Sequence, residues 1–137
     1  MRLLQRNAAA CVLAFVTAGC ASVQAPPCAR SEQSAVSDQL YFGTSSANGA
    51  VTPAQWAAFL QSSVTPRFPA GLTVWPASGQ WRAADGAIIR EDSYVLTLVH
   101  PDDDPTDAAV RTLIADYKAR FSQEAVLRVR SHACASF

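Results

Sequence analysis

The stretch Ser-Tyr-Val-Leu-Thr-Leu-Val-His at positions 93–100 decides the fold of this chain. Its unbroken run of β-branched and aromatic residues predicts a strand. Side chains alternate between the two faces of a strand, and both faces are apolar here: Tyr94, Leu96 and Leu98 on one, Val95 and Val99 on the other. A strand of this kind needs cover on each side, so we expect something to lie on both faces of its sheet.

The segments before this strand predict two further strands and a helix. Residues 39–44 and 71–75 are strand-like, and after a break at 76–79 the strand pattern resumes at 80–82. Between them, Thr52, Pro53 and Gln55 form a helix start with a capping box, and Pro66 ends that helix. Asp85-Gly86 is a hairpin turn signal, and the return strand begins at 88–90.

The segments after it predict a second helix and a last strand. Asp104 or Thr106 is expected to cap the helix. Its buried stripe is Val110, Leu113, Ile114, Tyr117 and Phe121. Residues 125–137 alternate as a strand, with Leu127 and Val129 on one side and Arg128, Arg130 and His132 on the other.

The resulting order, β-α-β-β-α-β, predicts an α+β fold, the ferredoxin-like split β-α-β sandwich. Four strands form one antiparallel sheet with two helices on one face. Right-handed crossovers place the first and third strands in the middle and the last strand beside the first. The end of the last strand then lies near the start of the first.

The amino terminus predicts export. Arg2 and Arg6 precede an apolar run at 8–18, which is typical of a secretory signal and too short to cross a bilayer. Thr-Ala-Gly-Cys at 17–20 resembles the bacterial lipobox, although Thr17 stands where that motif usually has Leu. This resemblance implies a signal peptide of residues 1–19 and a lipid, such as palmitate, on Cys20. An ordinary secreted protein is the alternative.

The predicted organisation is therefore a signal peptide (1–19), a lipid-anchored tether (20–37) and one domain (38–137). Ala21 after the cysteine favours the outer membrane, facing the periplasm. Loss of Arg2 and Arg6 leaves nine basic against eleven acidic residues, a formal charge of −2. A domain without a basic excess is not expected to bind nucleic acid. The expected partner is therefore the membrane, which the chain contacts through its lipid.

Two cysteines remain in the predicted mature domain, Cys28 and Cys134. Thiols exported to an oxidising compartment usually pair, so we expect a disulfide between them. The predicted strand order brings the two positions together independently of this argument. Two unpaired thiols are the alternative.

Several short motifs resemble one family of small bacterial envelope proteins, domain of unknown function family 3574. They are Leu-Tyr-Phe-Gly at 40–43, Thr-Pro-Arg-Phe-Pro at 65–69, Gly-Leu-Thr-Val at 71–74, Gly-Gln-Trp-Arg at 79–82 and the Ser-Phe end. The resemblance covers residues 39–137 and implies an envelope location but no activity.

The most site-like residues are Trp81, Arg82 and Arg90, with Tyr41 as a further candidate. An aromatic plane beside guanidinium groups suits an anionic or planar ligand. Arg128 and Arg130 would join this cluster if the last strand shares its face. The alternative is a packed Trp81, with the two arginines paired to Asp85, Glu91 or Asp92.

No catalytic, cofactor or metal motif is recognised in the sequence. The acids at 102–104 are expected to complement a helix dipole rather than bind a metal. The favoured hypothesis is a non-catalytic module whose open sheet face binds a ligand, a partner or, in a homodimer, a second copy of the chain. The alternatives are a small dimeric α+β-barrel enzyme using His100 or His132, with a pocket on that face, and a structural envelope component.

Overall fold

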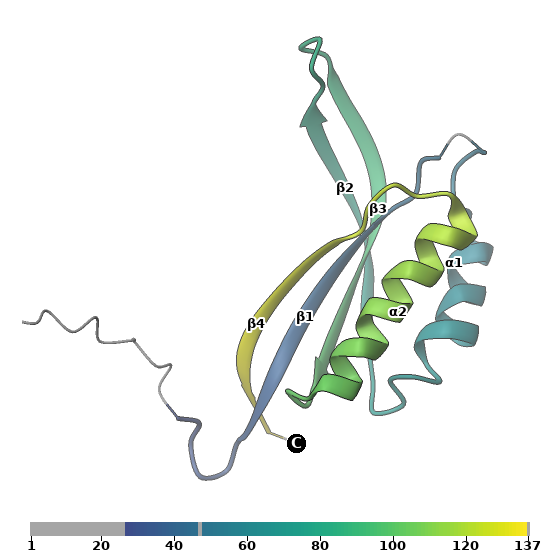
Figure 1. Cartoon of the computed structure of the whole chain (residues 1–137). Helices are drawn as coiled ribbons and strands as arrows, with labels where there is room; N and C mark the ends of the chain where they lie inside the picture. The colour runs from purple at the N-terminus through teal and green to yellow at the C-terminus, as the bar shows by residue number, and fades with distance from the viewer. Residues whose placement is uncertain (1–26, 47, 137) are drawn as a thin grey trace, which may run out of the picture.

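The computed structural model describes residues 27–46 and 48–136. The elements in chain order are β1 (Gln33–Gly43), α1 (Pro53–Phe59), η1 (Leu60–Val64), β2 (Thr73–Arg82), β3 (Ile88–His100), α2 (Asp104–Phe121) and β4 (Leu127–Ala135). The strands form one antiparallel sheet in the order β2-β3-β1-β4, and the two helices lie on one side of it (Figure 1). The predicted α+β fold is confirmed, including the central first and third strands.

The first strand is longer than the sequence predicts. β1 begins at Gln33 instead of Gln39, and its first residues pair with the end of β4, from Gln33 opposite Ala135 onward. The last five residues of the predicted tether at 20–37 therefore belong to the sheet. Polar residues such as Ser34 and Ser37 hide the strand pattern in this segment.

β2 is one continuous strand, so the predicted break at 76–79 is wrong. Pro76 lies opposite Tyr94 and Gly79 lies opposite Glu91 within the β2–β3 register. An edge strand tolerates proline because the missing N–H is not needed for a second neighbour. The β2–β3 hairpin projects beyond the rest of the sheet and closes through residues 83–87 (Figure 1).

The helix ends are mostly where the sequence predicts them. Thr52 and Gln55 form the predicted capping box, and Pro53 occupies the first turn of α1. The helix then widens into a π-helical turn, η1, in which the Thr65 N–H donates to the carbonyl oxygen of Leu60 at 2.9 Å. The cap of α2 is Asp103, not Asp104 or Thr106, because its Oδ1 accepts from the Thr106 N–H at 2.7 Å.

An aromatic core fills the space between the sheet and the helices. Phe42 of β1 packs against Trp56, Phe59 and Tyr117 of the two helices, with ring centroids 4.6–6.0 Å apart. The Tyr117 hydroxyl donates to the carbonyl oxygen of Gly43 at 2.9 Å, and burial raises the pKa of this hydroxyl. The predicted α2 stripe is buried except for Ile114, which is partly buried at the margin of the core.

Candidate functional site

The face of the sheet opposite the helices carries a row of apolar side chains across all four strands. The register places Leu127 beside Tyr41, Tyr41 beside Val95 and Val95 beside Trp75. Val95 is only 2 % exposed because its neighbours in the row flank it, whereas Leu127 is 60 % exposed and Trp75 40 %. Further exposed apolar side chains on this face are Val99, Val129, Trp81 and Ile89. We call this surface the open face.

The open face is almost uncharged. Strand residues point to it at odd numbers from β1 to β4, and of these positions within the described strands only Glu91 carries an acidic or basic side chain. The helix-covered face differs, because Arg128 and Arg130 of β4 point to it. The open face is therefore apolar and close to neutral.

A cleft of about 790 Å³ lies at one end of the open face, between the projecting hairpin and the loop that follows α2. Its floor includes the small residues Gly43, Gly79 and Ser93. Gly43 lies opposite Ser93 in the β1–β3 register, and Gly79 lies opposite Glu91 in the β2–β3 register. Trp81 lines it on the hairpin side, and Tyr41 lines it on the β1 side. The cleft exists because neighbouring strand positions carry little or no side chain.

The predicted cluster of Trp81, Arg82 and Arg90 is not brought together. Successive strand residues point to opposite faces, so Arg82 points away from the face of Trp81. Arg90 pairs with Gln80 in the register and also lies on the other face. It lines a neighbouring cleft of about 490 Å³ together with Asp92, and the two clefts share part of their lining, including Glu91.

The predicted alternative, in which these arginines pair with neighbouring acidic residues, is not found either. Among the described residues, neither Arg82 nor Arg90 forms an ion pair with Asp85, Glu91 or Asp92. Of the predicted ligand residues, the structure places only Trp81 and Tyr41 in one cleft.

Arg128 belongs to a buried ionic network on the helix-covered face, so it does not join Trp81. Its Nε and Nη2 donate to the two oxygens of Asp38 at 2.9 and 2.6 Å, and His100 Nε2 lies 2.9 Å from Asp38 Oδ2. The Asp38 side chain is fully buried. Burial alone would raise the pKa of Asp38, but hydrogen bonds from Arg128 and His100 lower it below its ordinary value.

The sequence contained a signal for Asp38 that the prediction missed. Asp38 alternates in phase with Val36, Leu40 and Phe42, all of which point to the covered face. A carboxylate at such a position must be paired, because an isolated buried charge is very costly. The predicted strand begins at Gln39, one residue after Asp38, so the alternation of Asp38 with the buried strand residues was not recognised.

Both histidines lie outside the large cleft. His100 is buried, and its Nδ1 lies 2.7 Å from the carbonyl oxygen of Pro101, so both ring nitrogens contact oxygen acceptors. His132 is exposed, with Nδ1 3.8 Å from Asp102 Oδ2. Asp102 also pairs with Arg130. A hydrogen bond from Thr106 lowers the pKa of Asp103, the helix cap.

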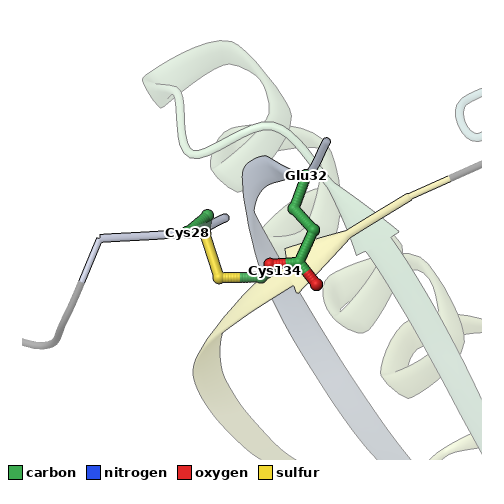
Figure 2. A group of neighbouring side chains, drawn as sticks. All are labelled: Cys28, Glu32 and Cys134. Atoms are coloured by element: carbon green, nitrogen blue, oxygen red, sulfur yellow. A yellow bond between two sulfur atoms is a disulfide. The ribbon is translucent and has the colours of Figure 1, made fainter. Parts of the chain in front are cut away.

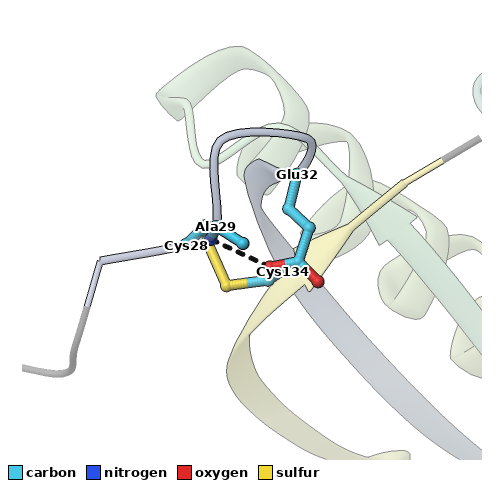
Figure 3. Close-up of a disulfide and its surroundings, with 4 residues drawn as sticks. All are labelled: Cys28, Ala29, Glu32 and Cys134. Atoms are coloured by element: carbon cyan, nitrogen blue, oxygen red, sulfur yellow. Dashed lines mark hydrogen bonds between the residues drawn. A yellow bond between two sulfur atoms is a disulfide. The ribbon is translucent and has the colours of Figure 1, made fainter.

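Cys28 and Cys134 form the predicted disulfide, with Cα atoms 5.5 Å apart (Figure 2). The bridge joins the segment before β1 to the end of β4. Beside it, Glu32 Oε2 accepts from the Ala29 N–H at 3.0 Å and closes a turn (Figure 3). Because the sulfur atoms bond to each other, this group of two cysteines and one glutamate is a cross-link rather than a metal site.

Residues 1–26 lie outside the described part of the chain, and with them the predicted signal peptide and Cys20. Among the described helices, none has both the length and the apolar character that a bilayer crossing requires.

The chain forms a small ferredoxin-like α+β domain, as its split β-α-β order shows. One face of the sheet is open, and the disulfide cross-links the strand ends. A family model matches residues 37–137, and the chain belongs to that family, described as proteins of unknown function (DUF3574). The predicted family is thus confirmed. No curated protein matches the chain.

Solved structures share the fold. A phage SAM lyase in complex with S-methyl-5'-thioadenosine is 11 % identical, with a TM-score of 0.54 over 75 % of this chain and 90 % of that chain. CutA from Synechococcus elongatus, complexed with a Bis-Tris molecule, is 13 % identical, with a TM-score of 0.51 over 77 % and 87 %. At these identities the likeness shows the fold alone.

Proposed function

We propose that this chain is an exported lipoprotein of the bacterial envelope, anchored at the outer membrane and facing the periplasm. Its domain acts by non-catalytic binding, and its open face binds the same face of a second copy. The observation that carries the proposal is the apolar row Leu127–Tyr41–Val95–Trp75, which crosses all four strands. Exposed apolar side chains grouped on one face mark interaction sites in soluble domains.

The charge of the open face supports a second copy as its occupant. In a two-fold dimer the same patch meets itself, so any charge on the patch lies near its own copy and repels it. Glu91 is the one acidic or basic side chain among the open-face strand positions described above, and it lies at the cleft end. The central row is uncharged and can pack against itself without such repulsion.

The oligomeric state tests the interface. We expect the chain from Ala21 onward, exported so that its disulfide forms, to sediment as a dimer at high micromolar concentration. Val129→Asp places a charge at a 45 % exposed position of the open face and should give a monomer. Ile88→Asp is the matched control, because Ile88 is also exposed but points to the other face. A strict monomer at high micromolar concentration would contradict the proposed interface.

The anchor has its own test. Mass spectrometry of the chain purified from its host envelope should find residues 1–19 removed and an acylated Cys20 at the new amino terminus. Cys20→Ser should abolish the acylation and release the chain from the membrane fraction. Native protein that begins at Met1 without fatty acid would contradict the anchor but would leave the dimer test unaffected.

A further inference from the structure

The charged residues that line the large cleft are all acidic. No Lys, Arg or His lines it, whereas two acidic residues, Glu91 and Glu124, do. Neither carboxylate forms an ion pair within the part of the chain that the structure describes. The cleft therefore has two acids at a concave surface and no basic side chain among its lining residues.

Glu91 is held in place before any ligand binds. Its Oε1 accepts from the backbone N–H of Ser45 at 3.2 Å. A Cβ atom at Gly43 would lie 2.5 Å from the same oxygen, so the carboxylate occupies the space that this glycine leaves open. A carboxylate positioned in this way loses little side-chain freedom when it meets a ligand.

The end of α2 adds to the negative potential of the cleft. Ser122 and Gln123, at the carboxyl end of this 18-residue helix, line the cleft. The carboxyl end of a helix carries a partial negative charge. The basic residues in the last turn, Lys118 and Arg120, do not line the cleft, and Arg120 donates to the Ser62 hydroxyl at 3.3 Å.

Aromatic side chains complete the lining. Trp81 is 57 % exposed and Tyr41 is partly buried, and both line the cleft. Aromatic faces attract cations, and tryptophan does so best. The charge, the helix end and the aromatic rings are separate features, and each one favours a cation.

We propose that this cleft binds an organic cation, an ammonium group on a small apolar body. The ammonium group lies between Glu91 and the Trp81 ring, and the apolar body lies over the floor of Gly43, Gly79 and Ser93. A volume of about 790 Å³ accommodates a molecule well above the size of a metal ion. This site shares Tyr41 and Leu127 with the row that we propose as the dimer interface, whereas Glu91, Glu124 and Trp81 lie outside that row. It reverses the ligand charge expected from the sequence.

Isothermal titration calorimetry with choline and with its uncharged isostere, 3,3-dimethylbutan-1-ol, tests the proposal. The full chain, as its host processes it, is used in a detergent with an uncharged head group. We expect choline to bind at least about tenfold more tightly than the isostere, since only choline offers a charge to Glu91 and Trp81. Equal binding of the two compounds, or no binding of choline, would overturn the proposal.

Two variants and a control locate the binding. Glu91→Gln keeps an acceptor for the Ser45 N–H but removes the charge, and Trp81→Leu removes the aromatic face; each should weaken choline binding about tenfold. Glu32→Gln changes a carboxylate at the disulfide end of the sheet and should leave choline binding unchanged. An unchanged affinity in Glu91→Gln would overturn the proposal. The Val129→Asp variant should still bind choline, so failure of the dimer and failure of the cleft are distinguishable.

Discussion

The two faces of the sheet place a strand carboxylate in opposite surroundings, one enclosed and one accessible. On the covered face, Asp38 accepts from Arg128 and His100. On the open face, Glu91 accepts one backbone N–H, from Ser45, and has no basic partner among the described ion pairs. The comparison shows that burial decides whether an acidic side chain of this domain serves the fold or stays available to a ligand. The enclosed carboxylate is committed to the fold, and the accessible one keeps its capacity for a ligand.

The largest effect is expected from Asp38→Asn. This variant leaves Arg128 and His100 without the buried carboxylate that accepts from them, and Asp107, 2.7 Å from Arg128 Nη2, becomes the remaining counterion of the guanidinium. Losing one partner of a buried pair costs about 3–5 kcal/mol, and the Asp107 counterion places the expected loss near the lower end of this range. Urea unfolding at neutral pH should show a fall of this size in the free energy of unfolding. A loss below about 1 kcal/mol would show that the covered face does not depend on this carboxylate.

Acid should destabilise the domain through the buried carboxylate of the covered face. The pKa of Asp38 is lower in the folded state than its ordinary value of about 3.9. Its stabilising effect is therefore complete above about pH 4 and is lost as the pH falls through the folded-state value. Asp103, whose pKa is also lowered, contributes in the same direction. Unfolding free energies measured between pH 2 and pH 6 should fall less steeply in Asp38→Asn than in the unchanged chain.

The smallest effect is expected from Glu91→Gln, which changes stability by no more than about 0.5 kcal/mol. The glutamine oxygen can still accept from the Ser45 N–H, and no ion pair of the described residues is lost. Urea unfolding under the conditions used for Asp38→Asn measures this change. A loss as large as that of Asp38→Asn would remove the contrast between the two faces.

Local signals explain what the sequence predicts well. The capping box of Thr52 and Gln55 and the stop at Pro66 depend on neighbours in the chain, and both are confirmed. The strand order follows from the sequence of elements and the handedness of their connections. The Cys28–Cys134 pair follows from that order together with the expected export.

The errors arise where a contact depends on register. Trp81 and Arg82 are adjacent in sequence, but adjacent strand residues point to opposite faces, so their side chains are separated by the sheet. The start of β1 was missed because its polar residues are held by pairing with β4, a strand about 100 residues later. Glu91 was considered only as a partner for arginine, because nothing local indicates that its carboxylate occupies the space beside Gly43.

The disulfide has a consequence for orientation. Cys28 follows the proposed anchor, Cys20, by eight positions, which span at most about 28 Å when fully extended. The bridge holds the domain by the end of the sheet where β1 begins and β4 ends. The cleft lies at the other end of β1, which is eleven residues or about 35 Å long. A lipid on Cys20 would thus keep the bridged end next to the bilayer and direct the cleft into the aqueous space, where diffusing small molecules reach it.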